Sequence, residues 1–83
     1  MELKDTIEMM QSGDFKERFK AEYFQTKIRA EKLESMVVRL KEGTLEFKPT
    51  CSLDIFEEQL KHMHEYLGIL EKRAEIEGIT LIN

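Results

Sequence analysis

Apolar residues recur along two long segments at alternating spacings of four and three. The first segment covers residues 15–41 and the second covers residues 53–77. A repeat of this period gathers the apolar residues on one stripe of an α-helix, and that stripe faces a partner helix. The stripe residues are Phe19, Tyr23, Thr26, Ala30, Leu33, Val37 and Leu40 in the first segment, and Leu53, Phe56, Leu60, Met63, Leu67, Leu70 and Ala74 in the second.

Residues that favour helix ends flank both segments. Asp14 and Ser52 come just before them, where a side-chain oxygen accepts a hydrogen bond from a free backbone N–H. Gly43 and Gly78 come just after them, and glycine readily takes the left-handed conformation that ends a helix. We therefore expect two helices of matched length, roughly 40 and 38 Å at a rise of about 1.5 Å per residue.

Two matched helices joined by about ten residues are expected to fold back as an antiparallel hairpin. Residues 2–11 carry apolar side chains at helical spacing and predict a further short helix. Residues 44–48, within a loop over 43–51, and the tail at 79–82 alternate like strands. The sequence thus predicts one all-α domain over residues 1–83, a heptad-packed antiparallel two-helix hairpin with a short N-terminal helix.

The chain is short for a stable monomer. Its 83 residues include one cysteine, so it forms no disulfide within itself. Domains of this size without such links depend on regular helix packing or on oligomerisation. Several large apolar residues lie outside the two stripes, and they are either scattered on the surface or form an interface between copies. The short N-terminal helix has room to cover one such face, not both. We favour a homo-oligomer, in which the strand-like pieces exchange contacts between chains. The expected interface residues are Phe24, Ile28, Ile69, Ile76 and Leu81.

The net charge of −4 conceals an uneven distribution. Residues 15–41 carry a net charge of +4, whereas residues 42–83 carry −5. The basic first helix and the acidic second helix either attract each other across the hairpin or supply a site for an anion. The overall acidity argues against binding to a nucleic-acid backbone, which requires a strongly basic face.

Motifs of catalysis and metal binding do not occur in the sequence. It has no phosphate loop, no dinucleotide fingerprint and no nucleophile elbow. His62 and His64 are two residues apart on a helix, so they point to different faces and cannot share a metal ion. No apolar run approaches the roughly 20 residues of a membrane span. The N-terminus does not read as a signal peptide. We expect a cytoplasmic protein that is not an enzyme and uses no metal or cofactor.

Two patterns within the predicted helices carry a family resemblance. The first is a loose version of E-x-x-L-x-x-x-L-E-x-L, carried by Glu22, which stands one residue early, and by Thr26, Ala30, Glu31 and Leu33. The second is Q-L-x-x-M-x-x-Y-x-x-I-L-x-x-R, formed by Gln59, Leu60, Met63, Tyr66, Ile69, Leu70 and Arg73. Over residues 15–77 the chain resembles the small helical-hairpin proteins of bacteriophages, of a type found in crAss-like phages. Thr26 and Ala30 depart from the larger apolar residues that are usual in the first pattern.

The resemblance implies a phage origin and action in the cytosol of the host cell. Hairpins of similar build include anti-CBASS and anti-Thoeris sponges, multimers that sequester the cyclic nucleotide signals of bacterial immunity. A sponge of this kind needs cations for phosphates and aromatic rings for bases. The candidate ligand-binding residues, chosen because they are cationic or aromatic, are Tyr23, Lys27, Arg39, Lys48, Tyr66 and Arg73.

Two alternative functions are compatible with the sequence. The acidic residues of 42–83 and the exposed apolar residues are suited to a protein–protein inhibitor of a host defence factor. A structural coiled-coil protein of a phage would also show the two heptad stripes. The sequence alone leaves these alternatives open.

Overall fold

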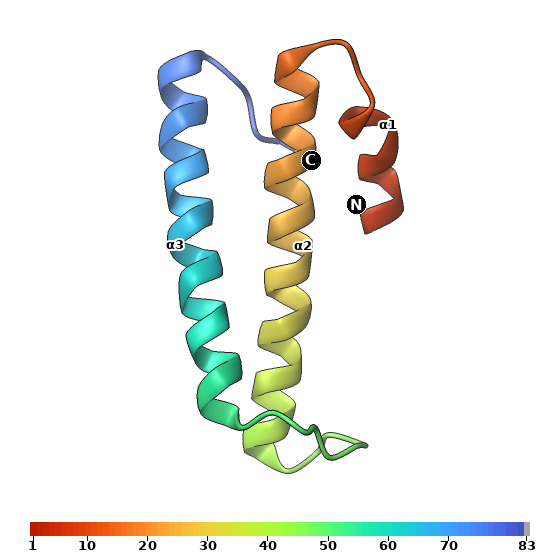
Figure 1. Ribbon diagram of the computed structural model, residues 1–83, viewed down its shortest axis with the longest axis vertical. Coiled ribbons are helices and arrows are strands. Elements are labelled where there is room, and N and C mark those ends of the chain that lie inside the picture. The colour runs from red at the N-terminus through yellow and green to blue at the C-terminus, as the bar shows by residue number, and fades with distance from the viewer. Residues whose placement is uncertain (83) are drawn as a thin grey trace.

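The computed structural model describes residues 1–82, and this range is all-α. A 3-10 turn, η1 (Leu3–Thr6), leads into the one-turn helix α1 (Ile7–Met10), which is followed by α2 (Phe15–Glu42) and α3 (Leu53–Glu77). Figure 1 shows α2 and α3 side by side as an antiparallel hairpin, with α1 on the other side of α2. The central helix α2 therefore contacts every other element.

The helix ends follow from the residues that flank them. The Asp14 side chain accepts a hydrogen bond from the backbone N–H of Lys16 at 3.0 Å, which satisfies a free donor at the start of α2. Ser52 precedes α3 without a side-chain cap bond. Gly43 and Gly78 both have positive φ, 75° and 68°, and end α2 and α3 in the left-handed conformation.

The two heptad stripes meet between α2 and α3, and every stripe residue is buried or half-buried. Burial is deepest at the end where the chain termini lie, far from the 43–52 loop (Figure 1). Only α2 and α3 pack together at the loop end, whereas α1 and the C-terminal tail also pack on the hairpin at the other end. The core cluster consists of Phe19, Tyr23, Phe24, Ala30, Leu67, Leu70, Ala74 and Ile79.

The N-terminal segment covers the face of α2 that the sequence assigned to an oligomer interface. Phe24 is only 3% exposed and belongs to the core cluster, and Ile28 is half-buried. Met9, at the end of the N-terminal segment, packs against the same cluster. The expectation that Phe24 is free to contact another copy is therefore wrong, because η1 and α1 pack along α2.

The C-terminal tail also packs on its own chain. Ile79 is 6% exposed, and its backbone N–H donates to the carbonyl of Ala74 at 2.8 Å, which turns the chain back at the end of α3. Leu81 is half-buried against the core cluster rather than free for a partner. Figure 1 shows the tail crossing from α3 to α2.

Neither strand-like piece is a strand in residues 1–82. Residues 44–48 form bends and irregular loop, and Phe47 is 58% exposed. A strand needs a neighbour for its backbone hydrogen bonds, and the other extended piece lies at the opposite end of the hairpin (Figure 1). Within the same residues, none of the helices combines the length and the apolar character needed to cross a membrane.

The turn at Gly78 gives a direct test of how the tail is held. We expect Gly78→Ala to lower the free energy of unfolding by about 1–2 kcal/mol, because a Cβ is unfavourable at positive φ. Gly13→Ala is the control, since Gly13 has no positive φ and open space around it. Urea denaturation followed by circular dichroism measures both variants. Equal stability of the two variants would contradict the role of Gly78.

Candidate ligand-binding site

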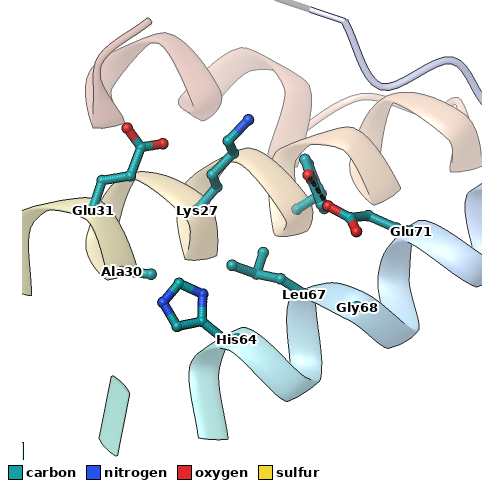
Figure 2. A pocket seen from close by; sticks show the side chains of 8 residues that line it. Lys27, Ala30, Glu31, His64, Leu67, Gly68 and Glu71 are labelled. Atoms are coloured by element: carbon teal, nitrogen blue, oxygen red, sulfur yellow. Dashed lines mark hydrogen bonds between the residues drawn. The ribbon is translucent and has the colours of Figure 1, made fainter. Parts of the chain in front are cut away.

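A groove lies on one flank of the seam between α2 and α3. Its volume is about 550 Å³. Figure 2 shows Leu67 and His64 of α3 directed toward Ala30 of α2, while Lys27 and Glu31 project from α2 away from α3. Gly68 adds no side chain, and a Cβ built there would meet no atom within 4 Å. The lining residues are Tyr23, Lys27, Ala30, Glu31, His64, Leu67, Gly68 and Glu71.

A hydrogen bond between the two helices closes one end of the groove. The Tyr23 hydroxyl donates to Glu71 Oε2 at 2.6 Å (Figure 2). The Tyr23 ring is 5% exposed and packs edge-on against Phe24, with 5.4 Å between ring centroids. The pKa of Tyr23 is raised to about 12. Burial of the phenol is the largest cause, and the hydrogen bond to Glu71 and the negative charges of Glu71 and Glu31 add to it. Tyr23 is therefore a protonated donor at neutral pH.

The walls of the groove carry charges of both signs above an apolar floor. Lys27 Nζ lies 5.9 Å from the centroid of the Tyr23 ring, and Lys27 forms no ion pair with any residue in the described range. The carboxylates of Glu31 and Glu71 are acceptors, and His64 offers a ring that donates or accepts. The floor comprises Ala30 and Leu67. The arrangement suits a ligand with a flat or apolar part, several donors and an anionic group.

The groove continues toward the loop end of the hairpin. A second hollow of about 320 Å³ is lined in part by Val37, Leu60 and, again, His64. Lys41 and Glu57 also line this hollow. Lys41 Nζ pairs with Glu57 Oε2 at 2.6 Å, the one ion pair between α2 and α3 in the described residues. Direct ion pairing between the basic and the acidic helix is thus limited to a single contact in the described residues, and Lys27 of the groove takes no part in it.

The six residues that the sequence singled out lie in different parts of the fold. Only Tyr23 and Lys27 line the groove. Arg39 and Lys48 line separate shallow hollows at the loop end.

The remaining two candidates are also outside the groove. Tyr66 is 41% exposed on the outer side of α3. The Arg73 guanidinium stacks 4.9 Å from the ring centroid of Phe19 and pairs with Glu77 at 3.5 Å. Arg73 therefore has a structural role at the end of the hairpin.

The groove residues of α3 are not among the binding residues that the sequence predicts. His64, Gly68 and Glu71 follow one another at spacings of four and three, so they share one face beside the heptad stripe. Gly68 is also the single glycine within a predicted helix, which marks a place where the surface can be hollow. In residues 1–82, no three His, Cys, Asp or Glu side chains gather as a metal site would require.

The Tyr23–Glu71 hydrogen bond predicts a pH-dependent contribution to stability. The folded protein holds the pKa of Tyr23 near 12, above its ordinary value of 10.0, so folding favours the protonated phenol. This contribution is full below pH 10 and is lost as the pH rises toward 12. We expect Tyr23→Phe to cost about 1 kcal/mol at neutral pH, as a typical hydrogen bond does.

A spectroscopic titration of tyrosinate absorbance measures the same effect directly. The wild-type chain has two tyrosines, and we expect the one that ionises later to vanish in Tyr23→Phe. Tyr66→Phe is the matched control and should leave the late step of Tyr23 in place. Two steps at the same pH in the wild type would contradict the described environment of Tyr23.

Comparison with known proteins identifies a family. A family model described as Sequestin matches residues 13–76, which is more than half of the chain and includes all of the groove residues. No curated protein and no solved structure matches the chain. The family's name denotes sequestration, in agreement with the sequestering function expected from the sequence. The matched range begins after η1 and α1 and ends one residue short of the end of α3, so it coincides with the helical hairpin. The chain belongs to the Sequestin family.

Proposed function

We propose that the protein is a non-catalytic phage anti-defence protein, which binds and sequesters a nucleotide immune signal as a homo-oligomer in the host cytosol. The observation that carries the proposal is the groove of about 550 Å³ between α2 and α3. Its volume lies within the range of roughly 300–1,000 Å³ that is typical of small-molecule sites. The family's name supports sequestration, and the chemistry of the groove supports a nucleotide.

The groove offers one partner for each part of a nucleotide. The apolar floor at Ala30 and Leu67 suits the face of a base or sugar. The carboxylates of Glu31 and Glu71 accept hydrogen bonds from sugar hydroxyls or an exocyclic amine. Lys27 supplies a positive charge for a phosphate, and it is half-buried, so its attraction is less weakened by water than at an open surface.

The state of Tyr23 supports binding without chemistry. A phenol serves as a base or nucleophile when its pKa is near the working pH, whereas the pKa of Tyr23 is raised to about 12. Its proton is also held by Glu71 at 2.6 Å. In our proposal Tyr23 keeps the groove in shape, and the signal leaves the protein unchanged.

Isothermal titration against a panel of cyclic dinucleotides, cyclic trinucleotides and cyclic ADP-ribose isomers tests this function. We expect one class to bind, and chromatography after release should recover it intact. Lys27→Gln should weaken binding roughly ten- to a hundred-fold, because a charge-assisted contact is lost. Lys48→Gln removes an equal charge outside the groove and should leave affinity unchanged. Heat with none of these ligands would refute the proposal.

A larger side chain at residue 68 would fill the groove without disturbing the fold, so it distinguishes a loss of binding from a loss of stability. We expect Gly68→Leu to block the ligand, since the new side chain enters the open space beside Leu67. The same change should raise the free energy of unfolding by up to about 1 kcal/mol, because glycine is a poor helix residue. A stable Gly68→Leu variant that still binds the ligand with wild-type affinity would place the site elsewhere.

A further inference from the structure

The outer side of α3 carries a second, uncovered stripe. Ile55, His62, Ile69 and Ile76 follow one another at a spacing of seven residues, and we name these four residues the outer stripe. The three isoleucines are 54%, 56% and 83% exposed, and the His62 side chain is 66% exposed. Neither α1 nor the tail reaches them, because both pack at α2 and the core cluster.

A repeat of seven keeps these side chains on one line along the helix, as one of the two apolar positions of a heptad does in paired helices, and this regularity distinguishes them from scattered surface residues. The outer stripe shares no residue with the groove or with the core cluster. It therefore needs an explanation of its own. A helix of similar length with apolar residues at the same spacing matches the stripe, and α3 of a second copy meets this description.

We propose that two copies of the chain pair through their outer stripes, with the two α3 helices antiparallel. In one register all four positions of the stripe face each other. Ile55 lies opposite the partner's Ile76, and His62 lies opposite the partner's Ile69. The two-fold axis then passes between residues 65 and 66. The inference rests on the homo-oligomer of the proposed function and names the surface through which two copies would pair. The residues of this surface are different from those of the groove.

The charges beside the outer stripe agree with this register. In an antiparallel pair, each flank of one helix faces the same flank of its partner. Glu58 then faces the partner's Lys72, and the two-fold axis repeats this pair at the other end. In the described residues Lys72 has no ion pair within its own chain, so it is free for a partner.

The opposite flank of the stripe is also self-complementary. Tyr66, which is 41% exposed, meets the partner's Tyr66 at the axis. Gln59 lies opposite the partner's Arg73, whose guanidinium stays on Phe19 and Glu77 of its own chain. One contact is unfavourable, because Glu65 faces the partner's Glu65. His62 Nδ1 lies 3.3 Å from Glu65 Oε1 in the same chain and offsets this repulsion when it is protonated.

Parallel pairing of the same stripes is less favourable. In a parallel pair each flank faces the other flank of the partner, which brings Lys72 beside the partner's Arg73 at two symmetric places. The two Glu58–Lys72 pairs of the antiparallel arrangement are lost, and no other favourable ion pair forms in their place. Charge complementarity thus selects the antiparallel arrangement, and it leaves both grooves open because no groove residue is part of the stripe.

Charge reversal tests the register in the full-length chain. Sedimentation equilibrium should show a dimer for the wild type. We expect Glu58→Lys or Lys72→Glu alone to weaken dimerisation about ten-fold or more, since two attractive pairs become repulsive, and the double variant to restore it. Lys61→Glu is the control, because Lys61 lies on the groove side and pairs with no residue across the interface. A wild-type monomer, or a double variant weaker than both single variants, would overturn the proposal.

Cysteine cross-linking tests the direction of the helices. In a Cys51→Ala background, we expect Tyr66→Cys to form a covalent dimer on mild oxidation, since residue 66 lies at the two-fold axis. Ile69→Cys should not do so, because its opposite residue is the partner's His62. Cross-linking through Ile69→Cys and not through Tyr66→Cys would show parallel pairing and refute the register. Nucleotide titration of Glu58→Lys tells whether the groove still binds when the dimer is weakened, so failure of the interface and failure of the proposed function are distinguishable.

Discussion

A pair of helices shares only one seam, and the rest of this structure follows from that constraint. The heptad stripes of α2 and α3 bury each other, but every other face of both helices starts uncovered. Apolar residues outside the seam add to the core at one end only, where Met9 and Ile79 pack with the cluster around Phe24. The core is therefore deep near the termini. It is thin near the 43–52 loop, because at that end α2 and α3 pack against each other with no third element beside them.

The groove exists for the same reason. On one flank of the seam neither α1 nor the tail fills the space between the helices, and Gly68 contributes no side chain to it. The hydrogen bond between Tyr23 and Glu71 spans this flank and joins residues that are 48 apart in the sequence. A buried phenol that lost this acceptor would leave its hydroxyl unsatisfied, so the bond fixes the relative position of the two helices at the end of the groove that it closes.

Local patterns in the sequence were sufficient to predict the hairpin, because heptad spacing and helix ends depend on neighbouring residues. They failed where distant segments meet. The distance between loop and tail in a matched hairpin predicts that Leu81 contacts a partner, yet the tail turns back at Gly78 and packs on the core of its own chain. Similarly, Tyr23 and Lys27 were recognisable as binding side chains, but Glu71 and His64 became visible only when the register between α2 and α3 placed them opposite. That register is set by the whole seam and by no short motif.

The acidic character of α3 makes sense when its three faces are considered separately. Glu57 pairs with Lys41 across the seam, Glu71 accepts from Tyr23 in the groove, and Glu58 stands beside the outer stripe. A groove that contained only cations would bind any phosphate, whereas Glu31 and Glu71 repel an anion that brings no donors of its own. Their presence favours a ligand with hydroxyl or amino groups near its phosphate over inorganic phosphate or a bare polyphosphate. Selectivity for a nucleotide signal over the abundant anions of the cell would thus depend on the carboxylates as much as on Lys27.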